Sequence, residues 1–230
     1  MILEDLLPRY PRGGEPTLRV NFVASVDGAV TVDGRSGGLG GPGDKQIFDM
    51  LRMTCDALIA AAGTVRTEKY DALRLDEAGR AWRRAHGLPE FPLMVVVSGS
   101  LGLDPGQLIF SDAPVPPLVV TTARAVPPPG LADVAEILAL GAEKVDLAAM
   151  VDELHRRGAT QLLCEGGPRL FGSLIEADLV DEVCLTVSPL LAGGTAGRIA
   201  AGPDGPARRL ALRSVLSEGD ELFLRYARSA

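Results

Sequence analysis

The chain has 230 residues, of which 47% are hydrophobic and 23% charged, a balance typical of a globular protein rather than a disordered one. Its 23 Lys and Arg against 30 Asp and Glu give a formal net charge of -7, whereas a general nucleic-acid binder normally needs a basic surface. We therefore expect no nucleic-acid partner. The length fits one domain, and we expect residues 1–230 to form a single module.

The cysteines and histidines predict neither a disulfide framework nor a metal site. Cys55, Cys164 and Cys184 stand among apolar residues without CxxC spacing, which is typical of small buried hydrophobic side chains. His86 and His155 stand alone, so no zinc-binding pattern is present. The first residues have no long apolar core, and no run approaches the roughly 18 apolar residues of a membrane span. We expect a soluble, cytoplasmic protein without a metal.

Apolar runs typical of strands alternate with helix-like segments along the chain. The strand-like runs lie at residues 18–26, 29–32, 56–63, 93–98, 117–122, 161–164, 182–191, 210–216 and 221–227. Helical periodicity and caps mark residues 44–53, 76–86, 147–157 and 169–178. Alternating β and α units predict an α/β fold with a largely parallel sheet, and the turn-like residues 218–220 predict an antiparallel pair at the end.

Two glycine-rich stretches are candidate phosphate cradles. Gly38–Gly43 matches the pattern GxGxxG, but Asp56, the nearest acidic residue, precedes the next strand instead of following it, so we interpret this stretch as a mobile surface loop. The second stretch, Glu165–Pro168, lies between a strand and a helix. Its two glycines allow a phosphate to approach closely, and the helix N-terminus offers free N–H groups. A plain strand-to-helix turn is the alternative.

Polar residues also recur at the carboxyl ends of the expected strands. They are Asn21, Ser25, Asp27, Thr64, Ser98, Ser100, Thr121 and Thr122. Each of them alone is well explained as a turn or capping residue. Together they predict a ligand site at the edge where open α/β sheets usually bind ligands.

Segments spanning about residues 18–194 resemble, in order, the riboflavin-biosynthesis pyrimidine reductase family, the reductase half of the bifunctional deaminase-reductase. They are VNFVASVDGAV, GRSGG, LRMTCDALIAAAGTV, LMVVVSGSL and LLCEGGPRLFGSLIEADLVDEVCLTVSPLLAGG. The resemblance implies a dihydrofolate reductase-like fold with three αβα layers around a mixed, mainly parallel sheet. It also implies NADPH as hydride donor, a ribosylaminopyrimidine 5′-phosphate whose ribosyl group is reduced to ribityl, and a homodimer.

The resemblance further implies roles for individual residues. Cofactor-binding positions are Ala24, Gly38, Thr64, Glu68, Ser98, Gly99, Ser100, Gly166, Gly167, Pro168, Arg169, Leu170 and Phe171. Substrate-binding positions are Asn21, Ser36, Arg52 and Glu165. Hydride transfer depends mainly on alignment and electrostatics. We expect Glu68 to be the first candidate for a catalytic carboxylate and Asp27 the second, with a turn hydrogen bond as the alternative for Asp27.

The loop after Thr64 departs from the family pattern. The family usually has an Asp followed by D/N-P-x-L, whereas this chain has Glu68-Lys69-Tyr70-Asp71-Ala72-Leu73. This difference keeps open a dihydrofolate- or pterin-type reductase, because fold does not fix substrate. A non-catalytic NADPH-binding protein is a third alternative. No HxE or PCxxC zinc signature occurs, so we expect no deaminase domain.

The sequence leaves two questions open. One is whether NADPH is preferred to NADH, and the other is whether reduction comes before or after deamination. Ser98, Ser100 and Arg124 are candidate partners for a 2′-phosphate.

Overall fold

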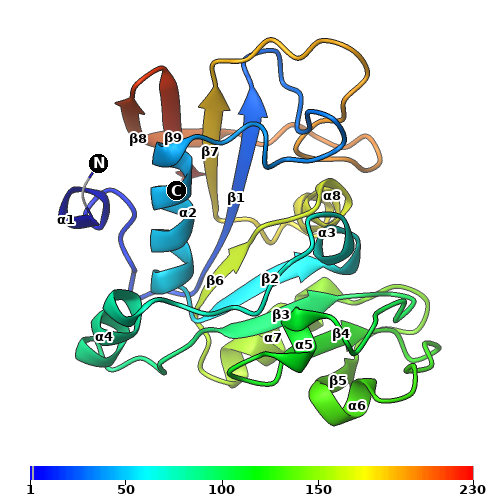
Figure 1. Ribbon diagram of the computed structural model, residues 1–230. Helices are drawn as coiled ribbons and strands as arrows, with labels where there is room; N and C mark the ends of the chain where they lie inside the picture. The colour runs from blue at the N-terminus through cyan, green and yellow to red at the C-terminus, as the bar shows by residue number, and fades with distance from the viewer. Residues whose placement is uncertain (2, 230) are drawn as a thin grey trace. The chain divides into compact units, whose positions relative to one another are not determined.

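The computed structural model describes residue 1 and residues 3–229, and the chain divides into two compact units. Unit 1 comprises Met1–Leu51 and Leu163–Ala230, and unit 2 comprises Arg52–Leu162. Strand β6 (Gln161–Cys164) runs across this division. Figure 1 shows the helices and strands of both units in chain order, coloured from blue to red.

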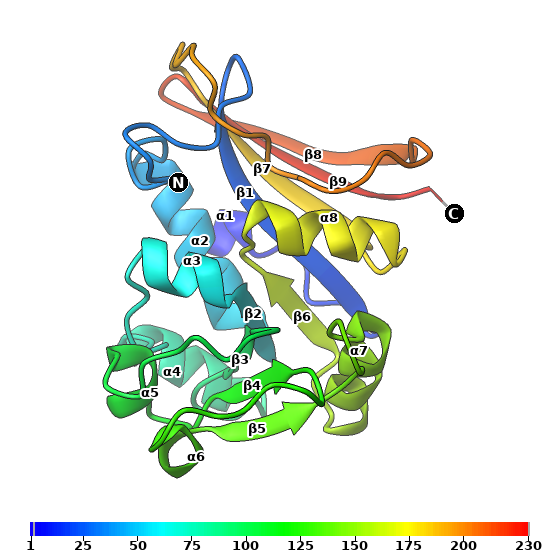
Figure 2. The same ribbon diagram turned by 90° about the vertical axis from the view of Figure 1, so that its right-hand side faces the viewer.

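Unit 1 is built on a mixed sheet in the order β6-β1-β7-β9-β8. Its further strands are β1 (Thr17–Ser25), β7 (Glu182–Ser188), β8 (Leu210–Glu218) and β9 (Glu221–Arg228). Strands β1 and β7 are parallel, whereas β9 is antiparallel to both β7 and β8. The β8–β9 hairpin is drawn beside β7 in Figure 2. The antiparallel C-terminal pair expected from the sequence is thus confirmed.

Helices cover both faces of the unit 1 sheet. They are α2 (Pro42–Thr54), most of which belongs to this unit, and α8 (Pro168–Glu176), with the short α1 (Leu3–Leu6) near the start of the chain. Asp44 of α2 bonds Thr186, whereas Phe171 of α8 stacks on Phe22, which is paired with Leu185. Successive strand residues point to opposite faces, so α2 and α8 lie on opposite sides of the sheet, as Figure 1 shows. The three expected layers are present.

Unit 2 contains a parallel sheet in the order β5-β4-β3-β2. Its strands are β2 (Ala57–Ala61), β3 (Leu93–Val97), β4 (Leu118–Thr121) and β5 (Glu136–Ala139). Its helices are α3 (Ala62–Thr67), α4 (Glu77–Ala85), α5 (Leu108–Ser111), α6 (Leu131–Val134) and α7 (Leu147–Arg156). Val95 and Val96 are fully buried, which fits the near-continuous valine run of a strand covered on both faces.

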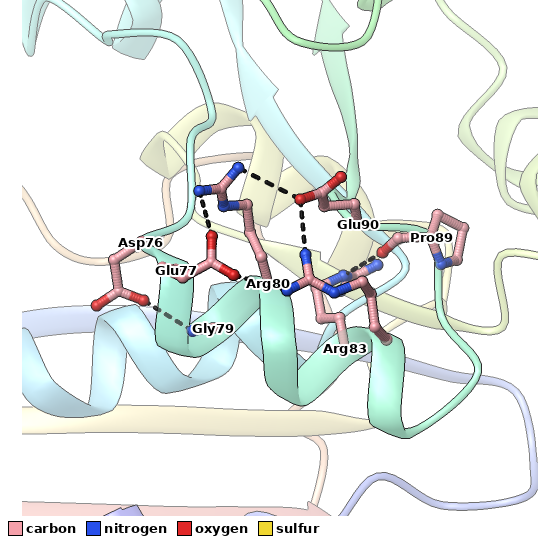
Figure 3. Close-up of polar contacts among 8 residues, drawn as sticks. Asp76, Glu77, Gly79, Arg80, Arg83, Pro89 and Glu90 are labelled. Atoms are coloured by element: carbon pink, nitrogen blue, oxygen red, sulfur yellow. Dashed lines mark hydrogen bonds and ion pairs between the residues drawn. The ribbon is translucent and has the colours of Figure 1, made fainter.

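Helix α4 carries a buried arginine that binds backbone carbonyls. The Arg83 side chain is fully buried; its Nε donates to the Pro89 carbonyl at 2.6 Å and its Nη1 to the carbonyls of Met53 and Cys55 at 2.8 and 2.6 Å. Figure 3 shows Arg83 beside Pro89, with the ion pairs of Arg80 on the same helix. Arg83 therefore fixes the segment at the end of α2 in place.

Three local expectations are corrected by the structure. Residues 29–32 are not a strand and contribute a single bridge between Val32 and Arg35. Helix α3 follows β2 directly where a loop was expected, because a helix of 6 residues shows little apolar periodicity. The end of the glycine loop is packed rather than mobile, since a Cβ on Gly43 would lie 2.6 Å from Phe223 Cζ.

All three cysteines are buried and unpaired, as expected. Burial raises the pKa of the Cys164 and Cys184 thiols to about 12, so both thiols stay protonated. Across residues 1 and 3–229, no helix has the length and apolar character needed to cross a membrane. The same residues contain no group of three or more His, Cys, Asp or Glu side chains arranged for a metal ion.

Candidate active site

The turn from β6 into α8 has the shape of an anion cradle. Gly166 has a φ of +95°, and a Cβ there would lie 2.9 Å from the Phe22 ring, so this position requires glycine. Gly167 is the N-cap of α8 and makes no side-chain cap hydrogen bond, whereas α4 and α7 are each capped by an aspartate. Pro168 has no N–H to leave unpaired. The first turn of α8 thus offers its remaining N–H groups to an anion.

Strand β1 places predicted site residues on both faces of the sheet. Ala24 shares a face with Phe22, whose ring centroid lies 4.9 Å from that of Phe171 in α8. Asn21 points to the other face, where α2 packs, and is only 9% exposed. Ala24, predicted to bind the cofactor, therefore lies on the α8 side, and Asn21, predicted to bind the substrate, lies on the α2 side.

Carboxylates from distant segments gather near the start of α2. Asp44 Oδ1 accepts a hydrogen bond from Thr186 Oγ1 at 2.6 Å, and Glu221 Oε1 accepts one from the Gly41 N–H at 2.8 Å. Burial raises the pKa of Asp44; the hydrogen bond from Thr186 opposes this shift, and the negative charges of Glu221 and Glu165 add to it. Glu165 was expected from the sequence, but Asp44 and Glu221 were not, because no spacing pattern links these segments.

The remaining predicted residues of unit 1 lie in the loop before α2 and on α8. The carbonyl of Ser36 accepts the Leu39 N–H at 2.9 Å, and a Cβ on Gly38 would lie 3.7 Å from Val32 Cβ. On α8, Arg169 is exposed, whereas the side chain of Leu170 is buried in the core. Leu170 can therefore contact a ligand at the helix terminus mainly through its backbone.

Asp27 anchors the loop that follows β7. Its carboxylate accepts hydrogen bonds from Ser25 Oγ, from the Gly193 N–H at 2.7 Å and from the Ala192 N–H at 3.2 Å. These bonds, that from Ser25 first, lower the pKa of Asp27 to about 2, so the carboxylate is ionised near neutral pH. The contacts support the turn role for Asp27, and its catalytic role stays a prediction.

In unit 2 the carboxyl ends of neighbouring parallel strands carry predicted site residues. Thr64 lies in α3 directly after β2, and Ser98 follows β3. The Ser98 N–H donates to the Val120 carbonyl at 2.9 Å, and Thr122 Oγ1 donates to the Gly99 carbonyl at 3.3 Å. The structure therefore brings Thr64, the segment from Ser98 to Ser100 and Thr122 to one edge of this sheet, as expected for parallel strands.

Glu68 ends α3 and begins the loop that departs from the family pattern. Its N–H donates to the Thr64 carbonyl at 2.9 Å. Two residues on, the Tyr70 ring lies against Arg52, with the guanidinium carbon 5.2 Å from the ring centroid, which is a cation–π contact. Tyr70 was not expected from the sequence, because only the fold places it against Arg52.

Nearly the whole chain matches known proteins. Residues 16–224 match the model of the RibD C-terminal domain. Over 183 residues, 78% of this chain and 83% of the relative, it is 32% identical to the 2,5-diamino-6-ribosylamino-4(3H)-pyrimidinone 5′-phosphate reductase of Archaeoglobus fulgidus. The protein of the same name from Methanothermobacter thermautotrophicus is 27% identical over 220 residues, which are 92% of this chain and 97% of that one.

Solved structures agree with this result. A pyrimidine reductase-like protein from Corynebacterium diphtheriae has a TM-score of 0.87 at 26% identity, with 99% of this chain and 98% of that chain covered. The Rib7 reductase of Saccharomyces has a TM-score of 0.70 at 16% identity, with 99% of both chains covered, and supports the fold alone. The chain spans 50% of the longer RibD protein of Haemophilus influenzae. Both the expected fold and the expected resemblance are confirmed: the chain belongs to the RibD C-terminal domain family.

Proposed function

We propose that this protein is an NADPH-dependent pyrimidine reductase, which reduces the ribosyl group of a ribosylaminopyrimidine 5′-phosphate to ribityl in riboflavin biosynthesis. The observation that carries the proposal is the uncapped N-terminus of α8 behind Gly166 and Gly167. The family resemblance assigns the cofactor pyrophosphate to this turn. The names of the relatives from Archaeoglobus and Methanothermobacter support the substrate class.

Membership of a reductase family implies a nicotinamide cofactor, and the residues of unit 1 fit one. When bound, the nicotinamide supplies the hydride. The N–H groups at the start of α8 would hold the pyrophosphate, since a helix N-terminus carries a partial positive charge. Phe22 and Phe171 pack together beneath the turn and keep water from that side. Ala24, on the same face, has too small a side chain to obstruct a planar ring.

Buried polar side chains of unit 1 support a substrate with polar groups. Asn21 and Glu165 are both less than 10% exposed in the structure, at 9% and 8%. An amide offers both donors and an acceptor and a carboxylate offers acceptors, so the two together suit a heterocycle with N–H and C=O groups. Because its pKa is raised, Asp44 holds a proton more readily than an ordinary aspartate and limits repulsion with Glu165.

The function is tested by following NADPH oxidation with three substrates in parallel. These are the diaminated and the deaminated ribosylaminopyrimidine phosphates and dihydrofolate. Turnover of either pyrimidine is expected, and the preferred one would show whether reduction precedes deamination. NADPH binding without turnover of any of the three would contradict the proposed reaction and favour a non-catalytic binding protein.

A pterin-type reductase is the second candidate function. The observation that favours it is the remodelled loop after Glu68, where Lys69 has a φ of +51° and the proline usual in the family is missing. Tyr70 contacts Arg52, a residue that the resemblance assigns to the substrate. A loop that differs from the family pattern beside this residue is consistent with a substrate whose heterocycle is not a pyrimidine. Turnover of dihydrofolate alone in the same assay would establish this candidate.

We also propose that the protein acts as a homodimer and that residues 1–230 form one reductase domain. The β8–β9 hairpin presents an apolar face in which Leu212, Val215 and Leu222 are 52%, 49% and 43% exposed. Val215 pairs with Leu224 and Leu212 with Tyr226, so these side chains lie on one face of the hairpin. An exposed apolar face of this kind supports association with a second copy.

A further inference from the structure

A long connection between β7 and β8, residues 189–209, crosses unit 1 without a helix or strand of its own. We call this connection the strap. All of its residues except Ile199 and Ala200 are exposed, and Figure 2 shows it in orange, running beside α8. Connections of this length without secondary structure are uncommon in compact domains, and many of them are functional. The contacts that fix the strap indicate what its function is.

The first part of the strap is fixed to the segment that follows β1. The Val26 N–H donates to the Leu190 carbonyl at 3.1 Å. The Asp27 carboxylate accepts the N–H groups of Ala192 at 3.2 Å and of Gly193 at 2.7 Å. The strap is therefore anchored at the carboxyl end of β1, before it reaches α8.

The strap meets α8 where two backbones lie in direct contact. The Ala201 N–H donates to the carbonyl of Pro168, the first residue of α8, at 2.9 Å. A Cβ on Gly172 would overlap the Ala201 carbonyl oxygen and lie 2.7 Å from the carbonyl carbon. A Cβ on Gly202 would lie 3.6 Å from the Gly172 Cα. Because a side chain at position 172 would occupy the place of the strap, only glycine allows this close approach.

A larger residue at position 172 would displace the strap rather than the helix. Leu170, Phe171 and Leu174 are buried and fix α8 on the sheet, whereas Ala201 is exposed. A helix interior also accepts alanine more readily than glycine. With alanine at position 172, α8 would therefore stay folded while the strap moved away and its hydrogen bond to the first turn broke.

We propose that the strap, seated on Gly172, is a positioning element that holds the first turn of α8 in the geometry that binds the cofactor pyrophosphate. Gly172 is the positioning residue, because it acts through Ala201 and not on the ligand itself. This inference rests on the proposed function, which places the pyrophosphate at this turn. Helix ends fray, so a first turn that is already held by the strap loses less conformational freedom when the ligand binds. All of the contacts that carry the inference lie within unit 1.

The seating of the strap is tested by amide hydrogen–deuterium exchange, which needs no ligand. In the unaltered protein the hydrogen bond to Pro168 is expected to protect the Ala201 amide. Gly172→Ala should remove this protection from the peptide that contains residues 198–204. The same variant should leave α8 protected and should not lower the melting temperature, since alanine favours the helix.

The effect on the cofactor is tested by calorimetric titration with NADPH. Gly172→Ala should weaken NADPH binding by about 5- to 20-fold, because a first turn that is competent for only a fraction of the time lowers the apparent affinity by that fraction. In steady-state assays the KM for NADPH should rise, while kcat and the KM for the pyrimidine phosphate stay unchanged. A variant that was merely less well folded would lower kcat and leave both KM values unchanged.

Two further variants provide a matched control and an independent test. Ser173 is exposed and follows Gly172 in α8, so Ser173→Ala also favours the helix but adds no atom against the strap. This control should change neither the exchange of Ala201 nor the affinity for NADPH. Ala201→Pro removes the N–H that binds the Pro168 carbonyl without altering α8, and it should weaken NADPH binding to a similar extent as Gly172→Ala.

The contrary outcomes can be told apart. If Gly172→Ala removed the protection of Ala201 but bound NADPH as tightly as the unaltered protein, the positioning role would be overturned. It would also be overturned if the Ala201 amide stayed protected, because the strap would then not depend on Gly172. Neither result would contradict the reductase proposal, whereas an unaltered protein that failed to bind NADPH would contradict the proposed function itself.

Discussion

At the scale of single residues, Asp27 illustrates how one side chain joins two segments. Its carboxylate accepts hydrogen bonds from Ser25 and from the backbone of Ala192 and Gly193. The folded state lowers the pKa of Asp27 from 3.8 to about 2, so the stabilisation is present above pH 3.8 and is lost as the pH falls through about 2.

Asp27→Asn should therefore lower the melting temperature near neutral pH and make stability less dependent on pH between about 4 and 2. The amide keeps one acceptor but loses the negative charge. Thermal melts across this pH range check the prediction, with the exposed Asp204→Asn as a control. An acid profile identical to that of the unaltered protein would mean that these hydrogen bonds do not stabilise the folded loop.

The second prediction at this scale concerns the contact of Tyr70 with Arg52. Its ring lies 5.2 Å from the guanidinium carbon of Arg52, and a cation–π contact contributes about 0.5–1 kcal/mol at such sites. Tyr70→Leu should raise the KM for the pyrimidine phosphate by about 2- to 5-fold, with little change in kcat, whereas Tyr70→Phe should behave like the unaltered protein. Steady-state kinetics measure both constants, and an equal loss in Tyr70→Phe would assign the role to the hydroxyl instead.

The residues foreseen from the sequence are those with a local signal. Gly166 and Gly167 stand out because a glycine pair between a strand and a helix is a pattern readable in one short segment. Asp44 carries no such signal, because its significance comes from Thr186, which only the fold brings near it. For this reason the sequence predicted the strand-to-helix turn, whereas it carried no signal for contacts between distant segments.

At the scale of elements, the turn into α8 makes the sharpest prediction. Gly167 is the N-cap and has an extended backbone, which an aspartate also adopts. Gly167→Asp should abolish NADPH binding, because it places a carboxylate beside the pyrophosphate. It should also keep or raise helix stability by about 0.5 kcal/mol, since Asp is a preferred cap.

Calorimetric titration with NADPH and a thermal melt separate these two effects. Gly167→Ser, a neutral cap, serves as the matched control and should retain most of the affinity. If Gly167→Asp bound NADPH normally, the turn into α8 would not be part of the cofactor site. The melt distinguishes this outcome from unfolding.

Helices and strands that are long enough to show a regular repeat of apolar residues were predicted correctly. In helix α7 the apolar residues of the predicted face are buried and Asp146 is the N-cap, as predicted. Strand β7 alternates between more and less buried residues, also as predicted. Helix α3 was missed because Ala62–Thr67 is too short for a period. Residues 29–32 have strand-forming side chains but no neighbouring strand to pair with beyond one bridge, so tertiary context overrides propensity there.

At the scale of the whole molecule, the apolar face of the β8–β9 hairpin bears on the homodimer. Leu222 is 43% exposed and lies at the end of that face near the turn. Leu222→Lys should shift the protein towards monomer, because burying an unpaired charge in an apolar interface costs about 3 kcal/mol. Light scattering after size-exclusion chromatography measures the mass of both forms. A monomeric unaltered protein would contradict the homodimer.

The central claim concerns the reaction, and steady-state kinetics with the ribosylaminopyrimidine phosphates test it most directly. The account predicts NADPH-dependent formation of the ribityl product, identified by mass spectrometry, with a kcat/KM of at least about 10⁴ M⁻¹s⁻¹ for one of the two pyrimidines. An enzyme that binds NADPH but converts neither pyrimidine would contradict the account.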